Sequence, residues 1–405
     1  MSRNRAYTLL WSGQALAEVG FSASMIAFPL LVLAITGSPV ASGLVLAADA
    51  TAQLLAGLPA GAAVDRWDRK KIMLGCEAAQ ALALVSLVAA LWQDTATVPQ
   101  MVAVAAIMGV CRALFEPAED ACLPRLVPEE QLATAIAMNS ARSSLGQMSG
   151  TALGGILFAA GRWVPFLVDL VTHCAAFVTL LFIRVPPRER RPAPTQHLGR
   201  EIVEGLRWVW QRREIRVTAL CAITLNLFFS AFYLVVIVLA HSRGMPSAEI
   251  GVMAAMLGVG GIVGAFLAPA LHRILSPYLS IALVFWVVAA LTPVAVFITD
   301  GYLMGGLFAG MTLLAPTANT TIGTHQLLLT PDELRGRLSG VMSVVTGGAG
   351  AIGPLLGGVL TALVSANHAV LLCAAGISLA TAAVTVNPTL RRYPQESPQR
   401  KDVLT

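Results

Sequence analysis

Almost the whole chain is divided into apolar segments that match the thickness of a bilayer's hydrocarbon core. Hydrophobic residues make up 56% of its 405 residues and charged residues 12%, against about 25% charged in soluble domains. A run of about 20 apolar residues is long enough to cross a membrane as a helix. The sequence therefore predicts an all-α membrane protein and excludes an ordinary soluble domain.

Twelve such segments can be drawn along the chain. They cover residues 8–35, 41–63, 72–92, 99–118, 137–160, 163–183, 217–240, 248–271, 279–298, 302–324, 338–363 and 368–387. With a cytoplasmic N-terminus, 23 of the 27 Lys and Arg residues fall on the cytoplasmic side, as the positive-inside rule requires. Both termini are therefore expected in the cytoplasm. Arg outnumbers Lys 24 to 3, which is typical of GC-rich bacteria, so we expect a multi-pass protein of the bacterial inner membrane.

The longest interruption separates the sixth segment from the seventh. It begins with PPRERRPAP, which is typical of an extended linker. An amphipathic pattern with two tryptophans follows, at Leu198, Ile202, Leu206, Trp208, Val209 and Trp210. This pattern predicts a helix on the inner leaflet or a solvated connector, and the two are compatible. The expected domains are a six-helix bundle (1–184), the linker (185–216), a second six-helix bundle (217–390) and a cytoplasmic tail (391–405).

The placement of charges and the motifs that the sequence lacks exclude several classes of function. The net charge is +5, but the basic residues lie in short loops, so no nucleic-acid partner is expected. The six cysteines lie in or beside apolar segments without a CxxC pair, which indicates packing residues and no metal site. The sequence has no GxxxxGK[ST], HExxH or GxSxG motif. We therefore expect neither an ATP-driven pump nor an enzyme, and no cofactor.

The two halves of the chain look like copies of one unit. Landmarks recur at one constant offset: Gly61 with Gly264, Pro128–Glu130 with Pro331–Glu333, and Gly150, Gly154, Gly155 with Gly353, Gly357, Gly358. The second copy of the loop after the second segment, GAFLAPALHR (264–273), lacks acids. Parallel duplication of a six-helix unit, with the site between the halves, is a common architecture of secondary transporters.

The loop between the second and third segments is GAAVDRWDRKK, residues 61–71. Its cations, which place it in the cytoplasm, are Arg66, Arg69, Lys70 and Lys71. It also holds Asp65 and Asp68, with Gly61 four residues before the first acid. A basic anchor needs only the cations, so this order predicts a structured element that clamps helix ends together.

With this loop and the duplicated halves, nearly the whole chain resembles the major facilitator superfamily. The resemblance implies twelve transmembrane helices in two six-helix bundles. It also implies that Gly61 allows close helix contact, that Asp65 interacts with a helix N-terminus of the other half, and that Arg69 joins a charge relay. These contacts would lock the inner side when the transporter faces outward. The candidates for the acidic partner of Arg69 are Glu116, Glu119 and Asp120.

A finer resemblance is to the drug-exporter branch that includes macrolide efflux and enterobactin exporter proteins. It is carried by LLWSGQALAEVGF (9–21), PLLVLAITGSP (29–39), VDRWDRKK (64–71) and FEPAEDACLPRLVPEEQLATAIAMNS (115–140). Exporters tend to carry GPxxGG in helix five, but here Thr151 replaces the proline and GPLLGG, with Pro354, lies in helix eleven. Arg112 matches the family's intramembrane arginine, whereas Glu116 stands where a glycine is usual. The glycines alone also fit a purely structural role, because small residues four apart let membrane helices approach closely.

Charged residues inside the predicted segments are the candidates for coupling. An acid at mid-bilayer costs about 3 kcal/mol, so such residues are functional candidates by default. Polar residues four apart occur in the first, second and sixth segments: Gln14, Glu18 and Ser22; Asp49 and Gln53; Asp169 and His173. Glu77, one turn inside the third segment, is expected to snorkel or to pair with loop cations. The second half has no acid clearly inside a segment.

These residues predict a proton-coupled exporter of amphipathic small molecules such as antibiotics, working by alternating access. Glu18 or Asp49 would bind a proton outside and release it inside in exchange for substrate; the alternatives are a neutralising ion pair with Arg112 and, for His173, an ordinary interior histidine. The expected partners are the substrate, protons and the bilayer, and the protein is expected to be a monomer. The functional alternatives are an exporter dedicated to one metabolite (a siderophore or a self-made antibiotic), an uptake symporter, and a non-transporting sensor or scaffold.

Overall fold

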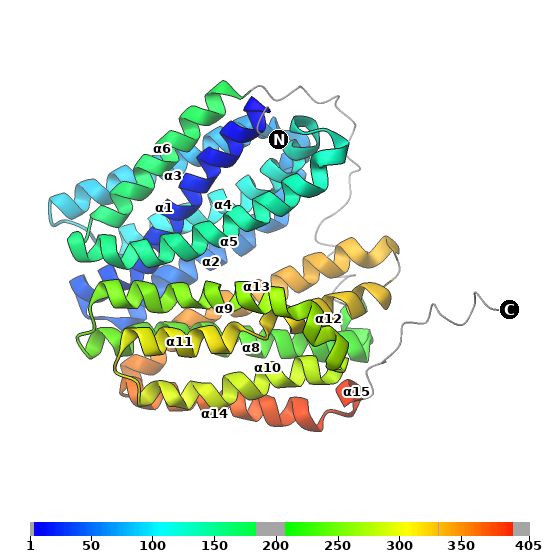
Figure 1. Ribbon diagram of the computed structural model, residues 1–405. Coiled ribbons are helices and arrows are strands. Elements are labelled where there is room, and N and C mark those ends of the chain that lie inside the picture. Colours follow the sequence, from blue (N-terminus) through cyan, green and yellow to red (C-terminus); the bar gives the residue numbers. More distant parts are fainter. Residues whose placement is uncertain (1–3, 184–206, 331, 392–405) are drawn as a thin grey trace.

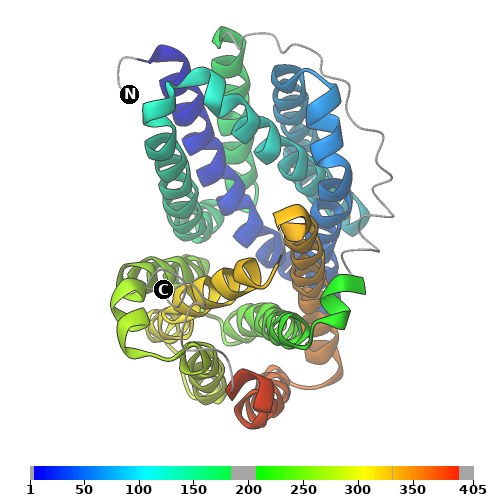
Figure 2. The same ribbon diagram turned by 90° about the vertical axis from the view of Figure 1, so that its right-hand side faces the viewer.

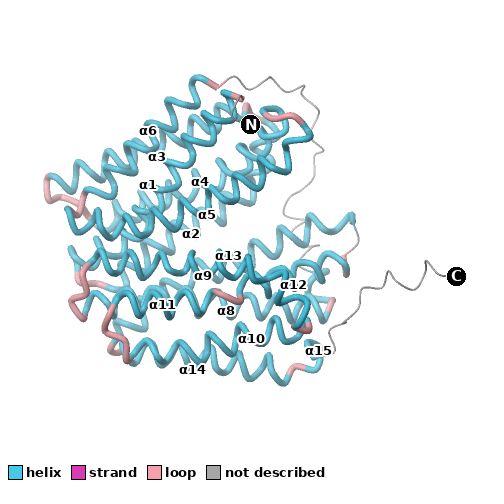
Figure 3. Tube along the Cα trace, in the orientation of Figure 1, coloured by secondary structure: helices cyan, strands magenta, loops and turns pink. Residues whose placement is uncertain are grey.

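The computed structural model describes residues 4–183, 207–330 and 332–391. Every regular element in these ranges is a helix (Figure 3). The first half contains α1 (Arg5–Thr36), α2 (Pro39–Arg66), α3 (Arg69–Trp92), α4 (Val98–Leu126), α5 (Glu129–Ala160) and α6 (Val164–Phe182). The second half contains α8 (Arg213–Ser242), α9 (Ser247–Ile274), α10 (Pro277–Leu291) with the 3-10 turn η1 (Thr292–Val296), α11 (Gly301–Thr312), α12 (Ala315–Leu328), α13 (Asp332–Leu363), α14 (Ala366–Val386) and the short α15 (Pro388–Arg391).

Each predicted segment coincides with a helix or with two consecutive ones. Ten helical segments of the described chain are long and apolar enough to cross a membrane. Segments 137–160 and 302–324 are not among these ten. The first lies in α5, which is rich in Ser and carries Arg142, and the second divides into α11 and α12 just before Pro316. The all-helical fold is confirmed, and the count of twelve spans stays a prediction for these two segments.

The local sequence explains where several helices begin. Short polar side chains accept the first free backbone N–H groups at the starts of α1, α2, α3 and α11, from Asn4, Ser38, Asp68 and Asp300. The turn from α1 to α2 takes only two residues, because Gly37 adopts the left-handed conformation (φ 65°) that ends α1.

The helices form two bundles, α1–α6 (the first bundle) and α8–α14 (the second bundle). In Figure 1 the bundles meet at one end and diverge toward the end at which α1 begins and α15 lies. We call these the far end and the terminal end. Figure 2 looks at the molecule from the terminal end, with the first bundle above the second. The two bundles are joined by packing of α2 on α13 and of α5 on α9.

The predicted duplication is present in the helices, but not at one constant offset. The number of residues from the start of α4 to the start of α11, and from α5 to α13, equals the offset of the sequence landmarks. The number from the start of α1 to that of α8 is larger, and the same larger number separates α2 from α9 and α3 from α10. The third helix accounts for most of the change, because α3 covers 24 residues whereas α10 and η1 together cover 20. The pairing of Gly61 with Gly264 is therefore wrong, because the residue equivalent to Gly61 is Pro269.

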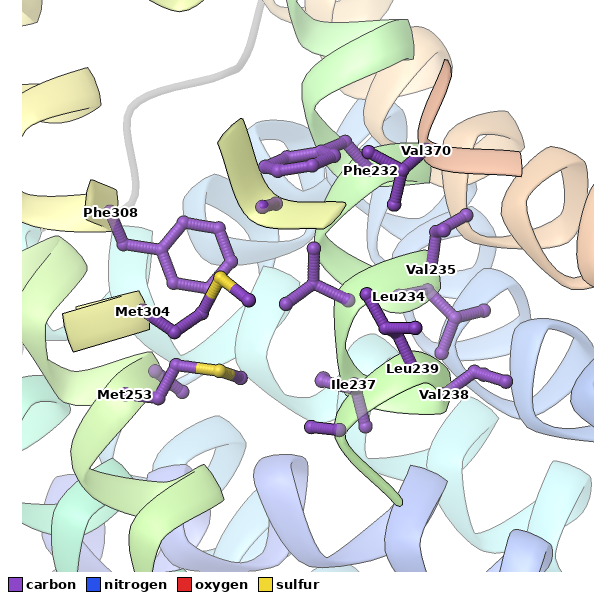
Figure 4. Close-up of a cluster of buried hydrophobic side chains, with 14 of the residues drawn as sticks. Phe232, Leu234, Val235, Ile237, Val238, Leu239, Met253, Met304, Phe308 and Val370 are labelled. Carbon is purple, nitrogen blue, oxygen red and sulfur yellow. The ribbon is translucent and has the colours of Figure 1, made fainter. Parts of the chain in front are cut away.

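Each bundle has its own apolar core. The core of the second bundle centres on α8, where Phe232, Val235 and Ile237 are fully buried against α9, α11 and α14 (Figure 4). Ile26 and Leu30 of α1 join this core, so apolar packing also connects the bundles. The core of the first bundle lies among α1, α3, α4 and α6.

The linker prediction falls mostly outside the described residues. Leu198, Ile202 and Leu206 lie there, as does the tail after residue 391. Of the rest, Val209 is buried against α8 and α13, and Trp210 is exposed. The domain boundaries and the position of a helix on the inner leaflet stay predictions.

Candidate functional site

The repeated GxxxGG pattern lies where helices cross. Gly154 of α5 faces α1, and a Cβ there would lie 2.6 Å from the carbonyl oxygen of Ala23. Gly357 of α13 faces α8 in the same way, with a Cβ 2.5 Å from the carbonyl oxygen of Ala231. Neither position can take a larger residue without moving a helix. Gly150 and Gly353 make equivalent contacts one turn earlier, with α1 and α8.

The last glycine of each pattern faces the opposite bundle. A Cβ on Gly155 would lie 2.7 Å from the Cα of Gly251 in α9, and one on Gly358 would lie 2.5 Å from the carbonyl oxygen of Pro39 in α2. Gly43 of α2 in turn packs on the backbone of Pro354. The pattern thus sets both the packing within a bundle and the contact between bundles. Gly150, Gly154 and Gly155 make these close contacts with Thr151 in place of the proline.

The loop after α2 lies at the terminal end, away from the contacts between bundles. A Cβ on Gly61 would have no atom within 4 Å, and Arg66 is exposed. Arg69 donates to the carbonyl oxygen of Ala121 in α4 (2.5 Å), and Lys70 donates to those of Leu181 and Ile183 at the end of α6 (3.1 and 2.8 Å). These cations therefore hold helix ends of the first bundle together. The side chain of Asp65 lies outside the described part.

A polar cavity of about 280 Å³ lies in the first bundle, on the terminal side of the contacts between bundles. It is lined by side chains of α1, α3, α4, α5 and α6. Its charged lining residues are Glu18, Glu77, Arg112, Glu116, Glu119, Asp120, Arg142 and His173. Carboxylates outnumber guanidinium groups five to two in this lining, so the cavity favours protons and cations over anions.

Arg112 of α4 is the centre of one charge cluster. Its guanidinium lies 3.3 Å from Glu18 of α1 and 2.9 Å from Glu116, one turn along α4. It also stacks over the ring of Phe21, 4.6 Å from the centroid. Gly146 of α5 packs directly on the Glu18 side chain. Two carboxylates share one guanidinium here, which leaves an excess of one negative charge.

Glu119 and Arg142 form a balanced pair beside this cluster. The guanidinium of Arg142 in α5 donates two hydrogen bonds, of 2.6 and 2.8 Å, to the two carboxylate oxygens of Glu119 in α4. The side chains of Arg142 and Glu119 are 9% and 6% exposed. A bidentate pair of this kind is geometrically fixed and carries no net charge. It joins α4 to α5 and leaves no charge for coupling.

The most deeply buried cluster connects α3 to α6. His173 Nδ1 lies 2.6 Å from Glu77 Oε2, and His173 Nε2 lies 3.3 Å from Asp169 Oδ1. Glu77 also accepts a hydrogen bond of 2.7 Å from Gln14 of α1. All four side chains are buried, and the Asp169 oxygens have no partner in hydrogen-bond geometry among the described residues. Two carboxylates, those of Glu77 and Asp169, therefore share one imidazole.

The expectation for Glu77 is wrong. Its side chain is 1% exposed and pairs with His173, so it neither snorkels nor meets the loop cations. The sequence did contain a signal, since Glu77 and Gln80 are three apart and therefore share a helix face. Arg142 was missed as a partner of Glu119, because nothing in the sequence places α5 against α4 at that depth.

Asp49 lies apart from these clusters. It is in α2, where its backbone packs on Gly109 of α4, one turn from Arg112. It does not line the cavity, and its Oδ1 is buried without a hydrogen-bond partner among the described residues. The structure thus pairs Glu18 with Arg112 and His173 with Asp169, in two separate clusters, and leaves Asp49 outside both. Of the candidates for Arg69, Glu116 and Glu119 pair instead with Arg112 and Arg142.

Solved structures with the same fold are transporters. A mutant form of the nucleoside transporter NupG aligns with 94% of this chain and 99% of its own, with a TM-score of 0.77 and 11% identity. A bacterial homologue of the iron transporter ferroportin, in an inward-facing state, covers 95% of this chain and 99% of its own, with a TM-score of 0.73 and 17% identity. At these identities the likeness shows the major facilitator fold alone.

Several relatives that match by sequence are named as efflux pumps or exporters. The multidrug efflux pump Tap of Mycolicibacterium fortuitum is 27% identical over 365 residues, 85% of this chain and 86% of its own. The enterobactin exporter EntS of Citrobacter koseri is 25% identical over 378 residues (89% and 88%), and macrolide efflux protein A of Streptococcus pyogenes is 26% identical over 202 residues (49% and 50%). The sequence also matches the family described as transmembrane secretion effector over residues 2–402. The chain therefore belongs to the transmembrane secretion effector family of the major facilitator superfamily, whose members are transporters and not enzymes.

Proposed function

We propose that this chain exports amphipathic small molecules in exchange for protons, by alternating access of its two bundles. The observation that carries the proposal is the cavity of the first bundle, with its two charge clusters that have more carboxylates than cations. An intramembrane acid is costly unless it is paired or protonated. Each cluster can therefore exchange a proton for a positively charged cargo without leaving a buried ion uncompensated.

The relatives support export over uptake. Tap and macrolide efflux protein A are named for efflux of drugs, and EntS for export of a siderophore. Two aromatic rings, those of Phe21 and Phe115, lie beside the charges in an otherwise polar lining. They would contact the apolar part of an amphipathic cargo.

The arrangement of the bundles corresponds to one state of the transport cycle. The terminal end is the cytoplasmic end in this proposal, because both termini and most cations are expected there. The structure then represents the inward-facing state, with the far end closed by Gly155 and Gly358. In the opposite state the loop of Gly61, Asp65 and Arg69 would meet the second bundle and close the inner side. The working unit is a monomer in the bacterial inner membrane.

Accumulation of fluorescent lipophilic dyes and antibiotics in a pump-deficient bacterium tests the proposal. Cells expressing the chain should accumulate less dye, and a protonophore should abolish the difference. Glu18→Gln, Asp49→Asn and Glu77→Gln are compared with Glu130→Gln, an exposed residue of the first turn of α5. We expect loss in Glu18→Gln and Glu77→Gln but not in the control. Unchanged accumulation across a broad panel, with good expression, would contradict multidrug export.

A dedicated exporter is the second candidate. The match to the enterobactin exporter extends over 89% of this chain, and that to Tap of Mycolicibacterium fortuitum over 85%. Such a protein would leave most of the dye panel unaffected and would export one metallophore or self-made antibiotic. Deletion of the gene for this chain in cells that make a siderophore would then leave the siderophore inside the cells. Expression of the Glu18→Gln variant in the deleted strain would not restore export.

A further inference from the structure

The turn between α9 and α10 differs sharply from its equivalent between α2 and α3. With the start of α10 aligned on the start of α3, Ser276 corresponds to Asp68, and both side chains cap the helix that follows. The hydroxyl of Tyr278 donates to the carbonyl oxygen of Thr385 at the end of α14 (3.0 Å), as Lys70 does at the end of α6. The two turns therefore have the same frame, and the difference lies in what fills the space beneath them.

In the first bundle this space is apolar and closed. Val64 of α2, Ile72 of α3 and Ala118 and Cys122 of α4 pack together there, and all but Ile72 are buried. The side chain of Arg69 reaches across the same helices to the carbonyl oxygen of Ala121. The described side chains in this space are apolar except for the thiol of Cys122 and the guanidinium of Arg69.

In the second bundle the equivalent residues are polar and line a cavity of about 560 Å³. The equivalents of Val64, Ile72, Ala118, Ala121 and Cys122 are His272, Ser280, Thr321, Thr324 and His325. Arg69 is replaced by Pro277, which cannot cross the space, and Asp65 by Arg273. The five changes at His272, Ser280, Thr321, Thr324 and His325 each add a hydrogen-bonding group, whereas Ile274 and Leu275 of the same lining replace Arg66 and Trp67.

The geometry points to a binding site for a phosphate group in this cavity. Arg273 supplies a permanent positive charge, and His272 can supply a ring N–H; the Nδ1 of His325 lies 3.0 Å from the carbonyl oxygen of Thr321. His272 and Arg273 are exposed, whereas Ser280 and Thr321 are 2% and 6% exposed. The two hydroxyls donate to the carbonyl oxygens of Ser276 and Thr317, and that of Thr321 also lies 3.5 Å from Nδ1 of His272, so Thr321 would have to exchange its bond to Thr317 for one to the phosphate. The described lining contains no carboxylate, so an anion meets no like charge. The N-terminus of α10 adds a favourable dipole.

The site would perform the task that Arg69 performs in the first bundle. A phosphate group bound by Arg273, His272 and Thr321 would join the end of α9 to α12, as Arg69 joins α3 to α4. The terminal end is expected at the membrane surface, where acidic lipid headgroups lie. The phosphate can therefore belong to such a headgroup or to a soluble ion, and the chemistry of the site is the same for both.

Thermal unfolding of the purified full-length chain in lipid-free detergent tests the site. Inorganic phosphate at low millimolar concentration should raise the Tm with saturation, against chloride of equal ionic strength; a non-specific salt effect would rise without saturating. The variants are Arg273→Gln and Thr321→Ala. The second introduces the residue type of the equivalent position in the first bundle, Ala118. We expect binding about tenfold weaker in each, and unchanged binding in Arg5→Gln, an exposed cation of the same end.

Lipid discs separate the two sources of phosphate. If phosphatidylglycerol discs raise the Tm above that in phosphatidylcholine discs and abolish the response to inorganic phosphate, the headgroup occupies the site. If the response persists in both kinds of disc, the ligand is a soluble phosphate. The proposal is overturned if neither phosphate nor phosphatidylglycerol changes the Tm of the parent chain, or if both variants respond as the parent does. Thr321→Ala decides the matter if Arg273→Gln fails to fold.

Discussion

In the first bundle, Glu119 and Arg142 form a buried ion pair between α4 and α5, whereas the equivalent residues of the second bundle are Ile322 and Val345. The same contrast holds elsewhere. With each helix aligned on its start, the equivalents of Glu77, Asp169 and His173 are Phe285, Leu371 and Ala375, and the equivalent of Glu18 is Asn226. Around α8 the second bundle has an apolar core of fully buried Phe, Val and Ile side chains instead (Figure 4).

The glycines that set helix crossings are nevertheless the same in both bundles. Gly154 and Gly357 each face the first helix of their own bundle, and Gly155 and Gly358 each face the second helix of the other. Duplication therefore preserved the residues that fix the backbone arrangement. The polar residues diverged, and in the mechanism proposed above only the first bundle supplies the groups that hold protons.

The largest expected effect is on the Glu119–Arg142 pair. Glu119→Gln leaves Arg142 buried without a counter-charge, which should lower the free energy of unfolding by about 3–5 kcal/mol. Introducing the residues of the second bundle at both positions, Glu119→Ile with Arg142→Val, should restore most of this stability. Thermal unfolding in detergent measures both variants. A double variant no more stable than Glu119→Gln would mean that the two bundles are not interchangeable at this position.

Alanine at the glycines between the bundles should have the next largest effect. Gly155→Ala and Gly358→Ala place a Cβ against the backbone of the other bundle, which should destabilise the closed far end by about 1–3 kcal/mol. That corresponds to a shift of roughly 5–150-fold toward the opposite state. Dye export should therefore fall in both variants, and to a similar extent.

A matched control for these variants lies in α13. Gly350 is on the same helix as Gly358, and a Cβ there would meet no atom within 4 Å, so Gly350→Ala should export normally. Loss of export in only one of Gly155→Ala and Gly358→Ala would mean that the two glycine patterns do not stabilise the closed far end equally.

The fold and the candidate residues could be predicted from sequence because they depend on local patterns. Apolar length predicted the helices, since a bilayer sets one minimum length for all of them. Spacing by four predicted that Asp169 and His173 share a face, and they lie 3.3 Å apart. Glycine spacing predicted close helix contacts at Gly154 and Gly357, where the structure has them.

The pairing of charges could not be predicted in the same way. Whether Arg112 meets Glu18 or Asp49, and whether Glu77 meets His173 or a loop cation, depends on the rotation and depth of helices far apart in sequence. The pairing of Gly61 with Gly264 failed for a related reason. A constant offset cannot reveal that the third helix of each half differs in length, and this shifts every residue of α1 and α2 relative to α8 and α9.

A smaller effect is expected at the loop after α2. Lys70→Gln removes the donor to the last carbonyl oxygens of α6, which should lower the free energy of unfolding by about 0.5–1.5 kcal/mol. Lys71→Gln, at the exposed neighbouring position, should have no such effect. Tyr278→Phe is the corresponding change in the second bundle, where the hydroxyl bonds to Thr385. Tm values of the three variants in detergent would show whether both turns are held by the same kind of bond.

The smallest effect on stability, but an informative one for cargo, is expected at Glu116. Its side chain is 56% exposed and pairs with Arg112 one helical turn away, so Glu116→Gln should change the free energy of unfolding by only about 0.5 kcal/mol or less. The variant nevertheless balances the charge of the cluster, because Arg112 then faces Glu18 alone. Export of a cationic dye should fall, whereas that of a neutral macrolide should not, and the ratio of the two rates measures this directly. The equivalent residue in the second bundle is Asn319, which already lacks the charge. If both cargoes were exported by Glu116→Gln as by the parent chain, the excess negative charge of the first bundle would not select the cargo, and its difference from the second bundle would concern protons alone.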